Sequence, residues 1–331
     1  MKLKAAVIGS GVGLKHFEAI QNFKNSKVKS ICEFDKKRAN FLKKKYPKVE
    51  IVSDFNKIIK DKEINLLSIA SYDQFHFNQI SQAIKAGKNI IIEKPMCLKF
   101  SELKKIFRLI KKKRNVKMIS NMVLRTEPIF NFLRKKLEPK KVFYIEADYI
   151  WGRLNKLTKG WRRETKNYSI ILGTAIHMID LVMWLVKDKP KKVYAIANKN
   201  LTHGTKFKKN SFASCFLEFQ NNLIVKISAN STNHYKHMHE VKIFQSNKTI
   251  IQTESGVNLI KKEGESIKNK KLNLVYPLRK NRKTLIQSFI NCILKKKKPM
   301  MNLKEQFNLM SVCFALEKSL KNNKRVKVKY L

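Results

Sequence analysis

A lysine and a histidine are the side chains of this sequence whose type and setting best suit chemistry on a hydroxyl group. Lys94 lies between Glu93 and Pro95, shortly after the apolar residues 90–92. An ammonium beside a carboxylate can hold a bound cofactor and polarise a hydroxyl. His177 stands three residues before Asp180 on a predicted helix, so the two share one face. The unperturbed pKa of imidazole suits proton transfer near neutrality.

Lys94 must be positioned by the apolar run that precedes it. A short run without polar residues predicts a parallel strand buried on both faces. Pro95 cannot donate to a β-ladder and ends the strand, so Glu93 and Lys94 reach the carboxyl edge of the sheet. Open α/β sheets bind their ligands at that edge. The ordinary alternative is a strand that ends in two solvated charges.

A glycine-rich segment follows a first predicted strand at residues 4–8 and precedes a helix that runs to residue 23. Glycines at this place allow a tight turn and let a pyrophosphate approach a helix N-terminus. The third glycine comes two residues after the second, so the loop is one residue shorter than the usual fingerprint. The predicted cofactor-binding residues here are Gly9, Gly11, Val12 and Gly13.

An acid follows the second predicted strand, residues 28–32. Glu33 stands twenty residues beyond Gly13, where an acid commonly accepts the ribose hydroxyls of NAD and disfavours a 2′-phosphate. Three basic residues at 36–38 come soon after and could accommodate NADP. We therefore expect NAD, with NADP left open. The alternative for Glu33 is a solvated carboxylate at a strand end.

Strands and helices continue to alternate up to residue 122. Further strands are predicted at residues 49–52, 64–70, 89–92 and 116–122. Helices are predicted after a cap at Asp54, over residues 76–86 up to Gly87, and from Ser101 to about residue 113. Such alternation predicts a doubly wound parallel sheet of the Rossmann type over residues 1–122.

After residue 122 the pattern changes to strands with alternating apolar and polar residues. They are predicted at residues 142–150, 192–197, 213–219, 223–229, 239–244 and 249–252. One exposed face and one buried face are typical of antiparallel sheets. We expect residues 123–331 to form an α+β domain with an open, mainly antiparallel sheet, whose C-terminal helices could pack back on the first domain.

These features together resemble the glucose–fructose oxidoreductase / inositol dehydrogenase / rhizopine catabolism (Gfo/Idh/MocA) family, and the resemblance spans nearly the whole chain. The most specific part is the combination of Glu93-Lys94-Pro95 with the H-x-x-D pattern of His177 and Asp180. The other matching segments are the glycine loop with His16, Glu33, residues 71–76, residues 121–128, Gly160-Trp161-Arg162, and the C-terminal residues 276–291 and 307–330.

The resemblance implies a role for each site residue. Lys94 would hydrogen-bond the reacting hydroxyl and stabilise the developing alkoxide, while His177 would take the hydroxyl proton as hydride leaves for nicotinamide. Which of the two accepts the proton is left open. The cofactor contacts that the resemblance implies come also from Ser71, His76, Glu93, Lys94 and Pro95.

One position departs from the family. Many members carry an aspartate four residues before the histidine, where this chain has Gly173. The missing carboxylate argues against a polyol such as inositol. It is similar to variants in which the pocket is opened for a bulkier or differently charged substrate.

Arginines and a tryptophan form the expected substrate site. Trp161 with Arg162 and Arg163 could form a platform and an anion clamp, to which Arg125 could add. Arginine forks suit the phosphates of a sugar nucleotide or the carboxylate of a uronate. The alternative is a core tryptophan beside two surface charges. The substrate-binding residues predicted in full are Arg125, Trp161, Arg162, His177 and Asp180.

Three histidines, at 234, 237 and 239, raise the question of a metal. His237 and His239 would share one strand face, but no acid or cysteine completes a ligand set of three or four. We predict a solvated strand here and no metal.

The net charge of +48 comes mostly from lysines that are dispersed along the chain. A nucleic-acid groove needs clustered charges and stacking aromatics, so we expect no specific nucleic-acid partner. No apolar run reaches the length of a membrane span. The five scattered cysteines fit a reducing cytoplasm.

The sequence thus predicts an NAD(P)-dependent oxidoreductase acting on a secondary hydroxyl or ketone of a sugar or sugar nucleotide. A homo-dimer or homo-tetramer through the second-domain sheet is implied by the resemblance. The alternatives are a free sugar or cyclitol dehydrogenase of catabolism and a non-catalytic dinucleotide-binding regulator, because the same fold can bind a ligand without turnover.

Overall fold

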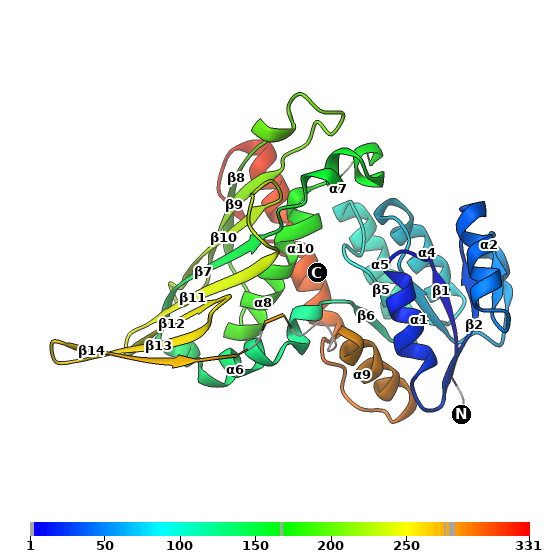
Figure 1. The fold of residues 1–331 in the computed structure, drawn as a ribbon, viewed down its shortest axis with the longest axis horizontal. Helices are drawn as coiled ribbons and strands as arrows, with labels where there is room; N and C mark the ends of the chain where they lie inside the picture. The colour runs from blue at the N-terminus through cyan, green and yellow to red at the C-terminus, as the bar shows by residue number, and fades with distance from the viewer. Residues whose placement is uncertain (1–2, 166–167, 275, 278–281) are drawn as a thin grey trace. The chain divides into compact units, whose positions relative to one another are not determined.

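The computed structural model describes residues 3–165, 168–274, 276–277 and 282–331. The chain divides into two compact units (Figure 1). Unit 1 comprises Met1–Val123 and Lys280–Phe307, and unit 2 comprises Leu124–Arg279 and Asn308–Leu331. The C-terminal part of the chain therefore contributes to both units.

Unit 1 is built on a parallel sheet of six strands in the order β3-β2-β1-β4-β5-β6. This order is that of the Rossmann fold, and it confirms the predicted sheet. The strands are β1 Leu3–Ile8, β2 Ser26–Cys32, β3 Glu50–Val52, β4 Leu66–Ile69, β5 Asn89–Ile92 and β6 Met118–Ser120. The last three residues of β5 are fully buried, as the apolar run predicted.

The helices of unit 1 follow the predicted alternation. They are α1 Gly13–Gln21, α2 Lys36–Lys45, α3 Phe55–Lys60, α4 Asp73–Lys85, α5 Phe100–Lys112 and α9 Arg282–Leu294. α1 packs against α9. The Asp54 side chain caps α3 by accepting a hydrogen bond from the Asn56 N–H at 2.8 Å, as expected. Gly87 follows α4 with a positive φ of 71°. α4 begins three residues earlier than predicted because β4 ends at Ile69 and the chain turns at once.

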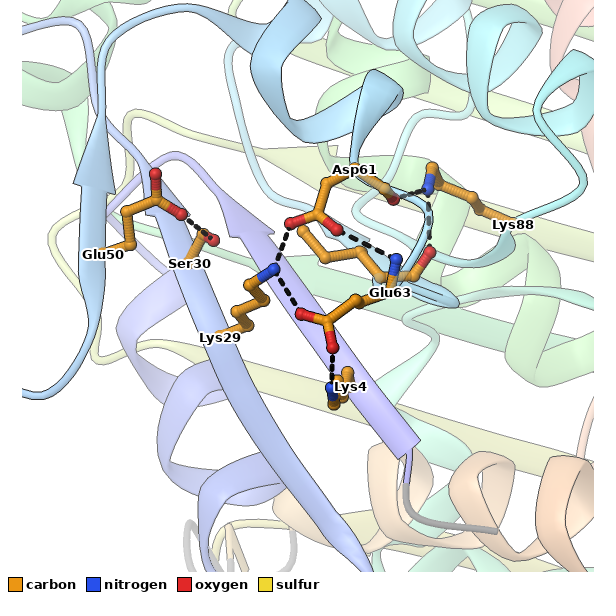
Figure 2. A network of polar contacts seen from close by, with 8 residues as sticks. Lys4, Lys29, Ser30, Glu50, Asp61, Glu63 and Lys88 are labelled. Carbon is orange, nitrogen blue, oxygen red and sulfur yellow. Dashed lines mark hydrogen bonds and ion pairs between the residues drawn. The ribbon is translucent and has the colours of Figure 1, made fainter.

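A polar network lies near the amino ends of the strands, away from the edge predicted to bind a cofactor (Figure 2). Lys29 Nζ lies 2.6 Å from a carboxylate oxygen of Asp61 and 2.6 Å from one of Glu63. The buried Lys88 donates to the backbone carbonyls of Asp61 at 2.6 Å and Ile64 at 2.8 Å. The network joins the segments that lead into β4 and β5.

Unit 2 contains a nine-stranded sheet in the order β14-β13-β12-β11-β7-β10-β9-β8-β15. Only the β7–β10 pair among these neighbours is parallel, so the expected open and mainly antiparallel sheet is confirmed. The strands are β7 Val142–Ile150, β8 Lys192–Asn198, β9 Phe212–Glu218, β10 Ile224–Asn230, β11 Met238–Gln245, β12 Lys248–Thr253, β13 Gly256–Glu263, β14 Ser266–Leu272 and β15 Val326–Lys327.

Helices cover one face of this sheet (Figure 1). α8, Ile176–Val186, packs on β7, and α10, Leu303–Asn322, is joined to β8 by a 3.0 Å hydrogen bond from the Ala195 N–H to the Ser319 hydroxyl. α8 is buried along nearly its whole length, as its apolar sequence predicted. The shorter elements are η1 Val123–Thr126, α6 Pro128–Lys136, η2 Pro139–Lys141, α7 Leu154–Thr158, η3 Trp161–Glu164, a π-helix at Ile171–Ala175 and η5 Asn200–Thr202.

The cysteines behave as expected from their scatter, because all five are free and buried. Among the described residues, no helix is both long enough and apolar enough to cross a membrane.

Candidate cofactor and active site

The glycine loop is closely packed at its two ends and open at its middle. A Cβ on Gly9, whose φ is +88°, would lie 2.7 Å from the Ala70 carbonyl oxygen. A Cβ on Gly13 would lie 3.0 Å from a methyl group of Val7. At Gly11, in contrast, a Cβ would meet no atom within 4 Å. The loop therefore leaves room at Gly11 where a pyrophosphate would approach the backbone.

The N-terminus of α1 offers the donors that such a group needs. Val12 stands at the N-cap, no side chain caps the helix, and no acid lies in its first turn. The first N–H groups of a helix have no partner within it, and the helix dipole favours an anion there. The residues present thus fit the pyrophosphate of a dinucleotide.

Glu33 lies against the same loop. One carboxylate oxygen accepts hydrogen bonds from the Ser10 N–H at 3.0 Å and from the Ser10 hydroxyl, and the other accepts from the Asp35 N–H at 3.0 Å. The Glu33 residue is only 3% exposed. The alternative of a solvated strand-end carboxylate is therefore wrong, because the carboxylate is held against the glycine loop.

A buried polar cluster connects α1 to the carboxyl ends of three strands. His16 on α1 lies 2.7 Å from the Ser68 hydroxyl through Nδ1 and 2.9 Å from a Glu93 oxygen through Nε2. Asn121 donates to the same Glu93 oxygen at 2.6 Å. Burial alone would raise the pKa of Glu93, but its bonds to His16 and Asn121 and the charge of Lys94 outweigh burial and lower that pKa to about 2. Glu93 is thus held as a carboxylate.

The segment around Pro95 is tied to the end of β4 by His76. Its ring nitrogens lie 2.7 Å from the Pro95 carbonyl oxygen and 3.1 Å from the Ser71 carbonyl oxygen. His76 is fully buried, so in this structure it positions two loops. The Ser71 hydroxyl donates to Gln79 at 2.6 Å. Direct contact of Ser71, His76 and Pro95 with a cofactor stays a prediction.

Lys94 follows β5 directly and is half-buried. It lies at the carboxyl edge of the parallel sheet, as we predicted from the apolar run and from Pro95. Its charge is close enough to Glu93 to help lower the pKa of that carboxyl.

In unit 2, His177 is half-buried on α8, whose residues are apolar except for His177 and Asp180. Its ring stacks on that of Tyr149, with the centroids 5.6 Å apart and the planes 10° apart. The His239 ring meets the edge of Tyr149 at 4.5 Å, and the Tyr276 hydroxyl bonds to His239 Nδ1. Aromatic neighbours from β7 and β11 therefore fix the orientation of the His177 ring.

Two histidines correct one sequence prediction, His239 on β11 and His237 directly before that strand. His237 and His239 do share a strand face, with ring centroids 4.9 Å apart. That face is not solvated, because His239 is 7% exposed and both rings pack on Tyr149. The alternating pattern of β7, which buries Tyr149, could be read from the sequence. The pairing of β7 with β11, which brings His239 opposite Tyr149, could not. Within the described part of the chain, no three histidine, cysteine or acidic residues are grouped as a metal site requires.

Arg125 and Asp180 form a buried ion pair. Arg125 Nε and Nη2 lie 2.9 Å and 2.7 Å from the two Asp180 oxygens, and both side chains are at most 3% exposed. Trp184, one turn further along α8, lies under the guanidinium of Arg134, whose Cζ is 4.3 Å from the ring centroid. The structure thus joins two predicted substrate residues to each other, and it gives them a role in attaching η1 to α8.

Gly173 lies in the π-helix that leads into α8, about one turn before His177. A Cβ on Gly173 would be 2.4 Å from the Tyr168 hydroxyl oxygen and 2.8 Å from Cζ of the same ring. The Tyr168 phenol therefore fills the space that a side chain at position 173 would take. No motif in the sequence pointed to Tyr168, although it stands only five residues before Gly173.

The predicted platform is formed by two indoles. The guanidinium Cζ of Arg162 lies 4.4 Å from the ring centroid of Trp161 and 5.7 Å from that of Trp151. Arg163 instead forms an ion pair with Glu164 at the surface. The alternative was a core tryptophan beside two surface charges. Arg162 does not fit it, because its guanidinium is stacked and its side chain is half-buried.

Comparison with known families agrees with this geometry. Residues 3–121 match the oxidoreductase family with an NAD-binding Rossmann fold, and residues 141–251 match the GFO/IDH/MocA C-terminal domain. The chain belongs to the Gfo/Idh/MocA oxidoreductase family. The resemblance drawn from the sequence motifs is thereby confirmed.

Relatives within the family are distant. An inositol 2-dehydrogenase of Salmonella typhimurium is 24% identical over 203 residues, which are 59% of this chain and 58% of that protein. The chain spans about half the length of the curated relatives it matches.

Solved structures share the fold over almost the whole chain. A myo-inositol 2-dehydrogenase from Lactobacillus plantarum is 18% identical with a TM-score of 0.85, covering 99% of this chain and 100% of that one. A scyllo-inositol dehydrogenase from Lactobacillus casei with bound NAD(H) and scyllo-inositol is 18% identical with a TM-score of 0.82, covering 99% of each chain.

Proposed function

We propose that this protein is an NAD-dependent dehydrogenase that transfers hydride between nicotinamide and a secondary hydroxyl or ketone of a sugar or sugar derivative. The observation that most supports the proposal is the open space at Gly11 beside the uncapped N-terminus of α1, with Glu33 bonded to the same loop. Membership of an NAD-binding oxidoreductase family supports it independently.

The preference for NAD rests on Glu33. A carboxylate held at the end of β2 accepts hydrogen bonds from ribose hydroxyls and repels a 2′-phosphate. Its bonds to Ser10 fix it next to the loop that would hold the pyrophosphate. NADP is the alternative, because Lys36, Lys37 and Arg38 follow in the chain.

The catalytic residues in this proposal are Lys94 and His177, and their pairing rests on the family resemblance. Nicotinamide, when bound, exchanges hydride with the carbon that carries the hydroxyl. Lys94 hydrogen-bonds that hydroxyl and stabilises negative charge on its oxygen, as a preorganised cation does best in a site shielded from water. His177 holds the hydroxyl proton, and the stack on Tyr149 aims its ring.

A sugar nucleotide is the preferred substrate class within the proposal. The Tyr168 phenol fills the space at position 173, where many family members carry an aspartate, and Arg162 on its indole platform suits an anionic group. A free cyclitol such as inositol is the second candidate, because named relatives are inositol dehydrogenases.

Turnover assays test the assignment. Purified protein would be incubated with NAD⁺ and, in separate reactions, with myo-inositol, scyllo-inositol and a panel of UDP- and GDP-sugars, while NADH absorbance is followed. The wild type should turn over at least one of them, and Lys94→Met and His177→Asn should lower kcat by about 10²-fold or more. NADH binding without turnover of any alcohol would favour the non-catalytic regulator instead.

We also propose that the uncovered face of the nine-stranded sheet joins copies of this chain into a homo-oligomer. Ile196 and Ile224 are each 47% exposed, and Tyr144 stacks on Phe244 at 5.6 Å on neighbouring strands. Exposed apolar residues on a sheet face are typical of association surfaces. Light scattering should show a dimer or tetramer for the wild type and a smaller species for Ile224→Lys.

A further inference from the structure

Three basic side chains lie together in the segment that follows β7. Arg153 precedes α7, Lys156 lies on α7 and Arg162 lies on η3. α7, which carries Lys156 and follows Arg153, packs against η3, which carries Arg162, so the three side chains belong to one packed segment. In agreement, partial burial and the positive charges of Arg153 and Arg162 lower the pKa of Lys156. These residues are here called the basic cluster.

Arg162 is the stacked member of the basic cluster. Its guanidinium Cζ lies 4.4 Å from the ring centroid of Trp161, on which it stacks. The ring centroid of Trp151 is 5.7 Å from the same atom. Trp151 is itself 7% exposed, and its backbone N–H donates to the Asn230 carbonyl at 2.8 Å. Stacking uses the flat faces of a guanidinium and leaves the N–H edge to bind a planar or tetrahedral oxyanion in a bidentate manner.

The basic cluster has no acidic counterpart. No ion pair found among residues 3–165, 168–274, 276–277 and 282–331 includes Arg153, Lys156 or Arg162, and every acidic residue of the chain lies in those ranges. The next residue, Arg163, is paired with Glu164, so an acid within reach serves a different arginine. Three cations held together without an acid repel one another, and a bound anion would relieve that repulsion.

The basic cluster is linked to the residue proposed as base, His177, through Trp151 and Tyr149. Trp151 stands two residues after Tyr149, so both side chains lie on the same face of the extended chain. Two residues of a strand span about 7 Å. Because the Tyr149 ring stacks on His177, a ligand that contacts Arg162 and His177 together needs the length of a substituted sugar.

We propose that the basic cluster is an oxyanion subsite, which binds a phosphate or carboxylate group of the substrate while another part of the substrate lies at His177. That the anion belongs to the substrate rests on the proposed dehydrogenase function. The binding of the anion itself does not, since it needs neither nicotinamide nor turnover.

Calorimetric titrations test the subsite. The protein, at about 0.3 M NaCl to screen its general positive field, would be titrated with UDP and with glucuronate, each with and without NADH. Uridine and glucose are the uncharged counterparts. Arg162→Ala removes the stacked cation, Arg162→Lys keeps its charge without the planar fork, and Arg114→Ala removes an exposed arginine of unit 1 as a matched control. Thermal unfolding of each variant checks its fold.

The expected result is saturable binding of UDP or glucuronate that Arg162→Ala weakens by about tenfold or more, as loss of a charged hydrogen bond predicts. Arg162→Lys should weaken it by less, and Arg114→Ala by under about twofold. If UDP binds more tightly than uridine, the group bound is a phosphate. If glucuronate binds more tightly than glucose, it is a carboxylate. Equal losses in Arg162→Ala and Arg114→Ala, or no saturable binding of either anion by the wild type, would overturn the proposal. NADH binding, recorded in the same series, tests the proposed function separately.

Discussion

Replacing Gly173 with alanine should destabilise this protein, although glycine-to-alanine changes inside helices ordinarily stabilise by about 1 kcal/mol. The new Cβ would lie 2.4 Å from the Tyr168 hydroxyl oxygen and 2.8 Å from Cζ. Tyr168 cannot swing away freely, because it is 5% exposed and packs edge-on against the fully buried Phe207 at 5.3 Å. Overpacking of this kind costs about 1–3 kcal/mol, so the clash should at least offset the helical gain and give a net loss near 1 kcal/mol.

A double-mutant cycle isolates the contact. Urea unfolding would be measured for the wild type, Gly173→Ala, Tyr168→Ala and the double variant. With Tyr168 truncated, alanine at position 173 has room, and its effect should become neutral or stabilising, giving a coupling free energy of about 1–3 kcal/mol. Gly204→Ala, where an added Cβ meets nothing within 4 Å, is the matched control. A Gly173→Ala variant as stable as the wild type in the presence of Tyr168 would refute the reasoning.

Three further predictions concern buried charges. Because the folded-state pKa of Glu93 lies below its ordinary value, near 2, its charge stabilises the fold above about pH 4.5, and this contribution disappears as the pH falls toward 2. Glu93→Gln should therefore lose about 3 kcal/mol of unfolding free energy at pH 7, and the difference from the wild type should vanish near pH 2 in acid titrations followed by circular dichroism. Lys88→Met should destabilise by about 1–3 kcal/mol in urea, since it removes the charged donor to the Asp61 carbonyl and to the buried Ile64 carbonyl. The exposed Lys85→Met should change stability by under about 0.5 kcal/mol. Arg125→Met should cost about 3–5 kcal/mol by leaving Asp180 charged and buried, and Arg125→Met with Asp180→Leu should recover most of that loss in the same assay.

The parallel sheet could be predicted because local patterns determine it. Continuous apolar runs such as residues 90–92 predict buried parallel strands, and β7 was predicted at its observed bounds from the alternation of apolar and polar residues in its second half. The spacing of Glu33 from the glycine loop predicted a contact with a cofactor; the structure shows the carboxylate bonded to Ser10 of that loop, and the cofactor contact stays a prediction. β13 and β14 were not predicted, because β14 is exposed along nearly its whole length and carries no apolar period.

The contacts that give the site its geometry could not be predicted. His16 and Glu93 are 77 residues apart, and Arg125 and Asp180 are 55 apart, so only the folded chain brings each pair together. The ion pair of Asp180 with Arg125 was not foreseen from residue type, and a contact of Asp180 with the substrate stays a prediction. The prediction that the strand at His237 and His239 is solvated was wrong, because Tyr149, which packs against both rings, is distant from them in sequence.

Binding of NADH and NADPH to the purified protein is the measurement that tests the central claim most directly. Titrations at about 0.3 M NaCl would compare the wild type with Gly11→Ala, whose added methyl group has room in the protein but occupies the approach to the loop. We expect saturable NADH binding that is tighter than NADPH binding, and a loss of about tenfold or more in Gly11→Ala with unchanged thermal stability. No saturable binding of either nucleotide by the wild type would contradict the account.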